Sequence, residues 1–260
     1  MLQNLAELWD LQALTPISNT PYTQILSALH NTRQVILKIS DDARKEAQIL
    51  ELYHGYGAVE IIEFNDNAIL LERALPGNAL KSYFPDRDEE SVKIACDVMK
   101  KLYKAPIPSN VKLPHLKDRL KALDNTTVPH IEKARNLRDK LLDTTISDVL
   151  LHGDLHHDNI LRNGEDWVII DPKGLIGDAT YDVACFIRNP IPELLSQPNV
   201  SEIIQKRIKL FAQELDIDAK HIAEWCFVDA VMSHVWAAED GIDPDYFGKI
   251  VEVMHSVVGL

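Results

Sequence analysis

Three polar residues stand at a spacing that can do chemistry. Asp154 is followed five residues later by Asn159, and Asp171 comes after an apolar run at residues 167–170. This spacing is typical of a catalytic loop and a metal-binding loop in enzymes that transfer the γ-phosphate of ATP to a hydroxyl. In that chemistry Asp154 accepts the proton of the acceptor hydroxyl, and Asn159 and Asp171 offer oxygen ligands to Mg²⁺. His-Gly-Asp alone is a common tripeptide, but the joint spacing favours the catalytic interpretation.

A lysine lies inside an apolar strand predicted over residues 34–39. Burying Lys38 in such a strand is costly without an anionic partner. Glu46, on the helical pattern at residues 43–54, is the candidate partner, and a pair of this kind positions the α- and β-phosphates of ATP in kinases. In the alternative interpretation Lys38 reaches water at a strand edge and Glu46 lies on a solvated helix face. Arg44 and Lys45 could then pair with either Glu46 or Glu51.

Length and composition agree with a soluble enzyme. The chain has 260 residues, 46% of them hydrophobic, and a formal charge of −13 from 27 basic and 40 acidic residues. This acidity argues against nucleic acid or an anionic membrane as partner. No apolar run approaches the roughly 20 residues that span a bilayer, and we see no secretion signal. The three cysteines have no metal-binding spacing and are expected to be reduced thiols of a cytoplasmic protein.

The order of predicted elements indicates an α+β protein with a bilobal, protein-kinase-like fold. A small β-rich N-lobe (1–76) is expected to bind the nucleotide, and a larger helical C-lobe (77–260) to carry catalysis and substrate binding. Residues 1–14 are expected to form a short amphipathic helix or an irregular arm. Strands are predicted at 21–29, 34–39, 59–64 and 68–71, and helices at 43–54, 92–103, 116–142 with a break near 125–127, 179–187, 203–215, 219–238 and 246–258.

Two segments of the N-lobe bear on nucleotide binding. Residues 72–77 resemble a hinge, where a strand ends at Pro-Gly, and the backbone groups of Glu72 and Ala74 are candidates for pairing with the adenine edge. A plain turn is the alternative. Residues 17–23, where a phosphate-binding loop is expected, contain no glycine. The nucleotide contacts of that segment therefore stay open.

These motifs carry a family resemblance. The chain resembles the aminoglycoside phosphotransferase family of the protein-kinase-like fold, in particular its streptomycin 6-kinase and hydroxyurea phosphotransferase branch. The resemblance rests on Leu-His-Gly-Asp-Leu-His-His-Asp-Asn-Ile at 151–160, on Val-Ile-Ile-Asp-Pro-Lys-Gly-Leu-Ile-Gly-Asp at 168–178, and on Tyr-Asp-Val-Ala at 181–184. The Asp-Pro-Lys form of the metal-binding loop points to the branch.

The resemblance implies a site and an activity. Asp154 is then the catalytic base, Asn159 and Asp171 hold Mg²⁺, and Lys38 with Glu46 positions ATP. The acceptor is then a small molecule of the streptomycin or hydroxyurea type. Two other functions stay open, namely a kinase of an amino sugar or similar metabolite, and a nucleotide-binding scaffold without turnover.

Three residues near the catalytic motif are expected to support it. Asp182, whose neighbours look buried, is expected to anchor the loop. His152 is expected to brace the loop by a hydrogen bond to its backbone. Arg188 is expected to form a salt bridge with a nearby acid. The charged run at 86–90 is interpreted as a solvated helix start.

A cationic acceptor needs acids and an aromatic face. The candidates are Asp178, beside the metal-binding loop, Glu239 and Asp240 at the end of a predicted helix, and Trp236 within it. The alternative is that Glu239, Asp240 and Gly241 simply end that helix.

Overall fold

A computed structural model describes residues 2–109, 111–239, 241, 245–257 and 259. They form two compact units, the first comprising the chain up to Asn78 together with Leu161–Pro172, and the second comprising Ala79–Ile160 and the chain from Lys173 onward. The division predicted at residue 76 did not anticipate that Leu161–Pro172 belongs to the first unit. This segment joins the first unit through backbone hydrogen bonds of Ile169 to Gly57 (2.8 Å) and of Val59 to Ile169 (3.1 Å).

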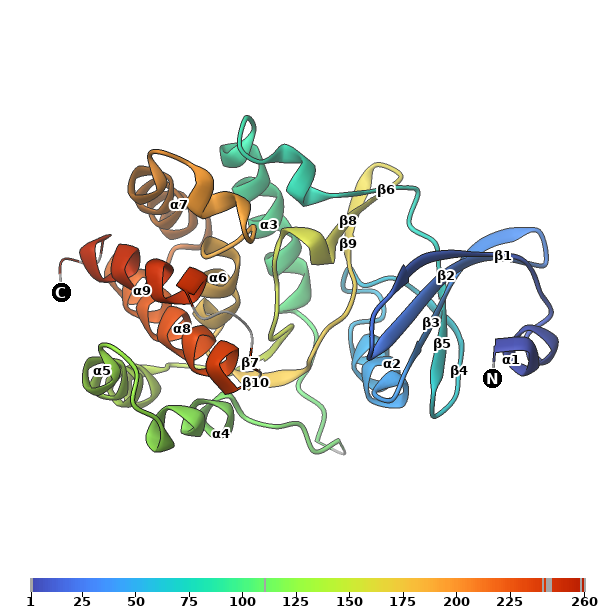
Figure 1. The fold of residues 1–260 in the computed structure, drawn as a ribbon, viewed down its shortest axis with the longest axis horizontal. Helices are drawn as coiled ribbons and strands as arrows, with labels where there is room; N and C mark the ends of the chain where they lie inside the picture. The colour runs from blue at the N-terminus through green and yellow to red at the C-terminus, as the bar shows by residue number, and fades with distance from the viewer. Residues whose placement is uncertain (1, 110, 240, 242–244, 258, 260) are drawn as a thin grey trace. The chain divides into compact units, whose positions relative to one another are not determined.

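An antiparallel five-stranded sheet is the frame of the first unit, in the order β1-β2-β3-β5-β4 (Figure 1). β2 and β3 pair without a shift in register around the turn Asn31-Thr32. Both turn residues have positive φ, the geometry of a tight two-residue hairpin. The strands are β1 (Leu11–Asn19), β2 (Thr23–His30), β3 (Arg33–Ser40), β4 (Ile61–Phe64) and β5 (Ala68–Glu72).

The start of the chain contains a strand that the sequence analysis did not predict. The helix α1 (Leu2–Leu8) is as expected, but β1 begins at Leu11 within the predicted helix or arm. β1 is irregular, with register shifts on either side of its central residues. Its Pro16 cannot donate a ladder hydrogen bond, which an edge strand tolerates. The bulges and the proline interrupt the alternation of polar and apolar residues from which a strand is predicted.

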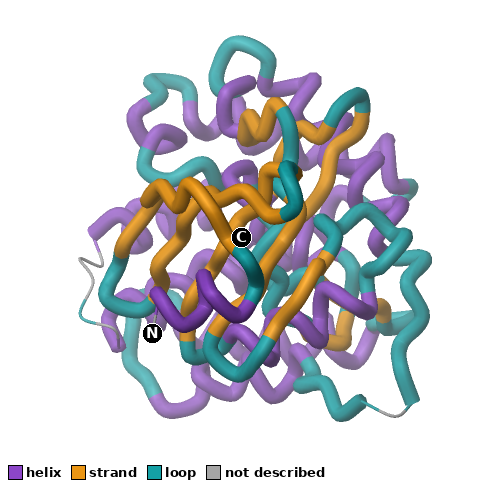
Figure 2. Tube along the Cα trace, turned by 90° about the vertical axis from the view of Figure 1, so that its right-hand side faces the viewer, coloured by secondary structure: helices purple, strands orange, loops and turns teal. Residues whose placement is uncertain are grey.

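The two faces of the sheet pack against different elements. Val35 and Leu37 of β3 are fully buried in an apolar core with Leu26, Leu70 and α1, which lies across this face (Figure 2). Because side chains alternate along a strand, Lys38 points to the opposite face. That face packs against α2 (Ala43–Leu52). The alternation of side chains along β3 thus directs Lys38 toward α2.

A second, three-stranded sheet has the order β6-β8-β9. Its strands are β6 (Pro76–Ala79), β8 (Ile160–Asn163) and β9 (Asp166–Ile169). Asn163 Oδ1 accepts a hydrogen bond from the backbone N–H of Leu75 (3.2 Å), and the N–H of Gly164 donates to the carbonyl of Leu75. These bonds tie the segment after β5 to the β8–β9 hairpin.

Helix α8 (Ala219–Glu239) is the centre of the second unit. Buried residues occur all along it from Ile222 to Ala237, as expected for a helix packed on every side. The helices α5, α6, α7 and α9 contact it. The predicted C-terminal helices are confirmed with small shifts at their ends, as α6 (Thr180–Ile187), α7 (Val200–Leu215), α8 and α9 (Asp245–Val257). The preceding elements are α3 (Asp88–Leu102), α4 (Leu116–Arg119), the 3-10 helix η2 (Leu120–Asn125), α5 (Ile131–Thr144), and the short strands β7 (Val149–Leu151) and β10 (Leu175–Gly177).

The sequence analysis interpreted the charged start of α3 as solvated, and this interpretation is only partly correct. Asp88 accepts hydrogen bonds from the guanidinium of Arg207 (2.6 and 2.9 Å), whose side chain is fully buried. Arg207 also donates to the carbonyl of Ile187 (2.9 Å). An arginine buried this deeply requires an anionic partner, and Asp88 supplies it.

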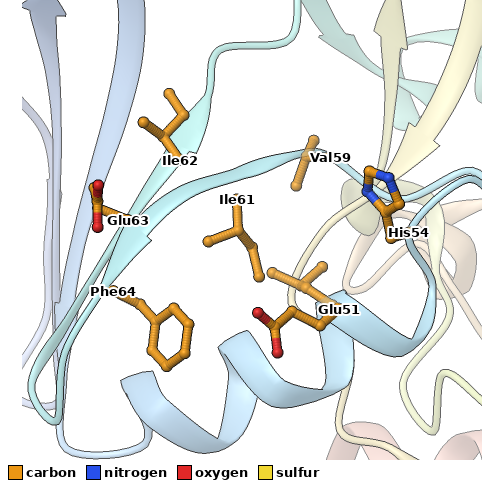
Figure 3. A pocket seen from close by; sticks show the side chains of 8 residues that line it. Glu51, His54, Val59, Ile61, Ile62, Glu63 and Phe64 are labelled. Atoms are coloured by element: carbon orange, nitrogen blue, oxygen red, sulfur yellow. The ribbon is translucent and has the colours of Figure 1, made fainter.

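A cavity of about 470 Å³ lies between α2 and β4 in the first unit. Figure 3 shows Ile61 and Phe64 pointing toward α2, with Glu51 and His54 on the helix side. The register shift within β4 explains how both apolar side chains face the helix.

Within the described part of the chain, no helix is long and apolar enough to cross a membrane.

Candidate active site

A three-residue ion cluster lies in the first unit. The Nζ atom of Lys38 is 2.6 Å from Glu46 Oε2 and 2.7 Å from Asp171 Oδ1. The side chains of Lys38 and Glu46 are only 12% and 7% exposed, whereas that of Asp171 is 34% exposed. Burial lowers the pKa of Lys38, but the two carboxylates outweigh it, so its pKa is raised above the ordinary value. The lysine is therefore charged and held between two acids.

The backbone places Asp171 for this contact. The residue follows β9 and has φ of 57°, in the left-handed region. Aspartate is one of the few residues other than glycine that adopts this conformation with little strain. The Asp171 carboxylate that follows β9 meets Lys38. About a third of the side chain remains open to solvent.

The hinge residues have different surroundings. The side chain and the backbone N–H of Glu72 are already hydrogen-bonded within the first unit. Its Oε2 accepts from Arg33 (3.2 Å), and its N–H donates to the carbonyl of Glu60 (2.9 Å). Ala74 is buried, and within the described residues we find no hydrogen bond from its backbone groups. An unpaired backbone group at a buried position is available to a ligand. Adenine recognition by either residue stays a prediction.

Hydrogen bonds to side chains hold the backbone of the segment that carries Asp154 in the second unit. Gly153 has φ of +82°, and the backbone N–H groups of His152 and Gly153 each donate to the carboxylate of Asp182 at 2.9 Å. The N–H of Asp154 donates to His152 Nδ1 (3.2 Å). The expected anchoring by Asp182 and bracing by His152 are confirmed. Burial raises the pKa of Asp182 to about 7, against the lowering effect of the two N–H groups.

The Asp154 carboxylate has two close polar neighbours. The thiol of Cys185 donates to Oδ1 at 3.6 Å, and His156 Nε2 lies 3.8 Å from Oδ2. Burial raises the pKa of this carboxyl, but the positive charges of His156 and Arg188 outweigh burial and the pKa is lowered. Asp154 is thus ionised at neutral pH, as a proton acceptor must be.

Asn159 presents its oxygen rather than its nitrogen. Its Nδ2 donates to the backbone carbonyl of Asp154 (3.0 Å) and lies 3.2 Å from His156 Nε2. The Oδ1 atom, the hard ligand in this side chain, has no hydrogen bond to the described residues and stays the predicted cation ligand. The described residues contain no preformed group of three or more His, Cys, Asp or Glu side chains suited to a metal. Mg²⁺ does not need one, because it is usually bound by one or two protein ligands together with phosphates and water.

The residues predicted to bind the acceptor each have different surroundings in the structure. Asp178 is buried, and one of its oxygens, Oδ2, is 2.9 Å from His221 Nε2 and 3.3 Å from Trp225 Nε1. Trp236 has a cation over its ring, but the cation is the chain's own Arg119, at 4.3 Å. Glu239 is exposed at the end of α8. Asp240 lies outside the described residues.

Sequence reasoning missed three polar residues of the second unit. Arg119 contacts Trp236 and the carbonyl of Gly153, Cys185 contacts Asp154, and Asp229 pairs with Arg188 (2.6 Å) and is fully buried. The salt bridge expected for Arg188 is confirmed. The one available signal was an aspartate within the apolar helix α8, which needs a partner when buried. Nothing in the sequence indicated that the partner would be 41 residues away.

Comparisons with known proteins agree with this geometry. A family described as aminoglycoside/hydroxyurea antibiotic resistance kinase matches residues 9–241. Streptomycin 3''-kinase of Klebsiella pneumoniae is 26% identical over 246 residues, covering 90% of this chain and 91% of its own length. Streptomycin 6-kinase of Streptomyces glaucescens is 24% identical over 265 residues, covering 94% and 85%.

A solved structure shares the fold. A thermostable mutant of aminoglycoside phosphotransferase APH(4)-Ia, in a ternary complex with AMP-PNP and hygromycin B, aligns with a TM-score of 0.70 at 14% identity, covering 99% of this chain and 97% of that one. At this identity the likeness concerns the protein-kinase-like fold alone. The family match spans most of the sequence, including the motifs around Asp154 and Asp171. This chain belongs to the aminoglycoside/hydroxyurea antibiotic resistance kinase family and is a small-molecule kinase.

Proposed function

We propose that this protein transfers the γ-phosphate of ATP to a hydroxyl of a small-molecule antibiotic of the streptomycin or hydroxyurea type. The observation that carries the proposal is the environment of Asp154. Its peptide is clamped by hydrogen bonds, while its carboxylate faces only a thiol and an imidazole among the contacts described above. An ionised carboxylate held in this way accepts the acceptor's proton as phosphoryl transfer proceeds.

The nucleotide is assigned to the ion cluster of the first unit. Lys38 neutralises the charge on the α- and β-phosphates, and Glu46 keeps its ammonium in place. Asp171 and Asn159 each offer an oxygen to Mg²⁺, which when bound screens the phosphate charges. The Ala74 backbone is the proposed contact for adenine. All three cysteines are free thiols, and together with the need for ATP this supports a cytoplasmic site of action.

For a cationic acceptor we keep Glu239 and Asp240 as the proposed partners. Asp178 already accepts from His221, Trp225 and the N–H of Thr180, so we assign it to structure around the site. Replacing Glu239 and Asp240 together by amides is expected to raise KM for a cationic acceptor by a few-fold, about the effect of exposed charge pairs, and to leave KM for ATP unchanged. An unchanged acceptor KM would move the cation site elsewhere.

The proposal is tested by turnover. Purified protein with Mg-ATP is screened against streptomycin, hydroxyurea and neutral amino sugars, and the phosphorylated product is identified by mass spectrometry. Asp154→Asn keeps the shape and is expected to lower kcat by about 10²–10⁴-fold, with the KM for ATP little changed. The matched control is Asp158→Asn, an exposed aspartate of the same segment.

The outcomes separate the three functions. Turnover of the antibiotics with loss in Asp154→Asn supports the proposal. Preferred turnover of an amino sugar would make the protein a metabolite kinase. Full activity of Asp154→Asn would show that another group is the base, and ATP binding without any transfer would indicate a scaffold.

A further inference from the structure

The peptide between Gly153 and Asp154 has both of its polar groups occupied by side chains. Its N–H donates to His152 Nδ1 at 3.2 Å, and its C=O accepts from Arg119 NH1 at 3.3 Å. The N–H of the preceding peptide goes to Asp182 at 2.9 Å. Three side chains therefore determine the orientation of the backbone that carries Asp154. Of these, Asp182 comes from α6 and Arg119 from the short helix α4.

Arg119 is itself held by an aromatic ring. The carbon at the centre of its guanidinium lies 4.3 Å from the centroid of Trp236, on α8. Stacking on an aromatic face suits the planar guanidinium and limits its rotation. Both residues are half-buried. The ring, the guanidinium and the Gly153 carbonyl thus form a chain of contacts from α8 to the residue before Asp154.

We propose that Arg119, stacked on Trp236, is a positioning residue for Asp154. The inference rests on the proposed function, since it takes Asp154 as the base. A misplacement of a catalytic group by about 1 Å lowers turnover by about 10²-fold. Arg119 does not touch the carboxylate that takes the proton, and its effect is through the Gly153 carbonyl.

Charge supports the same assignment. Asp229 is fully buried, and its Oδ1 has no hydrogen-bond partner among the described residues. Burial raises the pKa of Asp229, and the guanidinium groups of Arg188 and Arg119 oppose that rise. Asp229 and Asp154 thus share a region with these two cations. Removing Arg119 takes away one of the two guanidinium charges that oppose the rise in the pKa of Asp229.

The position also bears on the acceptor. Because Arg119 lies over Trp236, a cationic acceptor meets a guanidinium at that ring rather than an open aromatic face. Of the proposed cation partners, Glu239 at the end of α8 is then left to hold the acceptor without Trp236, and this ring serves the catalytic loop.

The first experiment measures the loop without requiring turnover. Arg119→Ala is expected to increase amide hydrogen exchange of residues 152–154 by about 10-fold or more. The matched control is Arg87→Ala. Arg87 also stacks on an aromatic ring, Tyr83, at 3.8 Å, and pairs with Glu90, but it has no contact with the loop. Equal loop exchange in the two variants would overturn the proposal.

The second experiment asks whether the effect is on catalysis. Arg119→Ala is expected to lower kcat by about 10–100-fold with KM for ATP unchanged, and Arg119→Lys to recover only part because it lacks the planar fork. Millimolar guanidinium is expected to restore several-fold activity to Arg119→Ala, and not to Asp154→Asn. In the double variant Arg119→Ala/Trp236→Leu the restoration should be lost, since the stacking surface is gone.

The two proposals fail in different ways. Wild-type protein that phosphorylates no acceptor contradicts the proposed function, and the exchange measurement still decides the role of Arg119. Wild-type turnover with full activity in Arg119→Ala, or no restoration by guanidinium, overturns the positioning role and leaves Asp154 as the proposed base.

Discussion

The two regions that carry the predicted site residues hold their acids differently. In the first unit one ammonium touches two carboxylates, because Lys38 lies 2.6 Å from Glu46 and 2.7 Å from Asp171. In the second unit the carboxylate of Asp154 lies 3.6 Å from the thiol of Cys185 and 3.8 Å from the imidazole of His156. The first contacts are charge-assisted and strong, and the second are weak.

The difference follows from the chemistry proposed for each region. A cluster that receives a polyphosphate must hold its cation ready, and ion pairs to partly open acids can rearrange when a ligand arrives. A carboxylate that takes a proton must keep its oxygens available, so the second unit holds the backbone of Asp154 and leaves the side chain weakly bound. Orientation is supplied by ions in one region and by peptide hydrogen bonds in the other.

The largest expected effect is in the first region. Asp171→Ala removes a proposed Mg²⁺ ligand and one of the two acids on Lys38, and is expected to lower turnover by about 10³-fold. Activity is measured across a Mg²⁺ titration. Asn159→Ala is expected to act in the same direction but less. Asp66→Ala, a surface aspartate paired with Arg44, is the control, and an unchanged Mg²⁺ dependence in Asp171→Ala would remove it from the metal site.

The next prediction concerns stability of the second region. Arg188 and Asp229 form a buried pair at 2.6 Å, and removing one partner of such a pair costs about 3–5 kcal/mol. Arg188→Met is therefore expected to lower the free energy of unfolding by that amount in urea denaturation. The double variant Arg188→Met/Asp229→Leu should recover much of the loss, because no buried charge is left alone. A double variant as unstable as the single one would show that packing, not charge, dominates.

The first region could be predicted well from the sequence. Lys38 stands in a clearly apolar strand, and a lysine buried in such a strand requires an acidic partner nearby. Glu46 is that acid, and the two residues are only eight positions apart. The strand leading to Asp171 was equally clear, since residues 167–170 are apolar throughout. Local patterns sufficed for the pair of Lys38 with Glu46, but the contact of Lys38 with Asp171, 133 positions away, was not predicted.

The second region could be predicted only in part. The motif around Asp154 and the anchoring Asp182 were readable, since both lie in distinct local patterns. The contacts of Arg119 with Gly153 and of Arg188 with Asp229 join residues 34 and 41 positions apart, and they depend on how helices pack. β1 was missed for a related reason, because bulges and Pro16 break its period. Tertiary packing, which local pattern does not encode, decides these cases.

A smaller effect tests the ion cluster without touching the proposed metal ligand. Glu46→Gln leaves Lys38 with Asp171 alone, so the ammonium is expected to lie closer to Asp171 and farther from the phosphates. KM for ATP should rise about tenfold, equal to about 1.4 kcal/mol, with kcat reduced less. Glu51→Gln, on the same helix but facing the α2–β4 cavity (Figure 3), is the control. Equal KM values in the two variants would contradict the role of Glu46.

The smallest expected effect is the pH dependence of a pair in the second unit. The hydrogen bond to Asp178 raises the pKa of His221 above its ordinary value of 6.5. Burial raises the pKa of Asp178, but His221 and the N–H of Thr180 outweigh it, and the pKa falls below 3.8. The His221 contribution is therefore complete below pH 6.5 and is lost as pH rises through the raised pKa. The Asp178 contribution is present above pH 3.8 and is lost as pH falls through the lowered one.

The pair is thus expected to stabilise the fold most between about pH 4 and pH 6.5. His221→Gln should lower the free energy of unfolding by about 1 kcal/mol at about pH 5.5, and by less at about pH 8.5, because the contribution of the charged imidazole is lost as pH rises through its raised pKa. Urea denaturation at the two pH values measures the difference, with His54→Gln in the first unit as the control. A loss that is equal at both pH values would mean that His221 stabilises the fold by packing and neutral hydrogen bonding, and a loss that grows with pH would reverse the assigned direction of its pKa. Either result would remove charge pairing with Asp178 as the way in which His221 stabilises the fold.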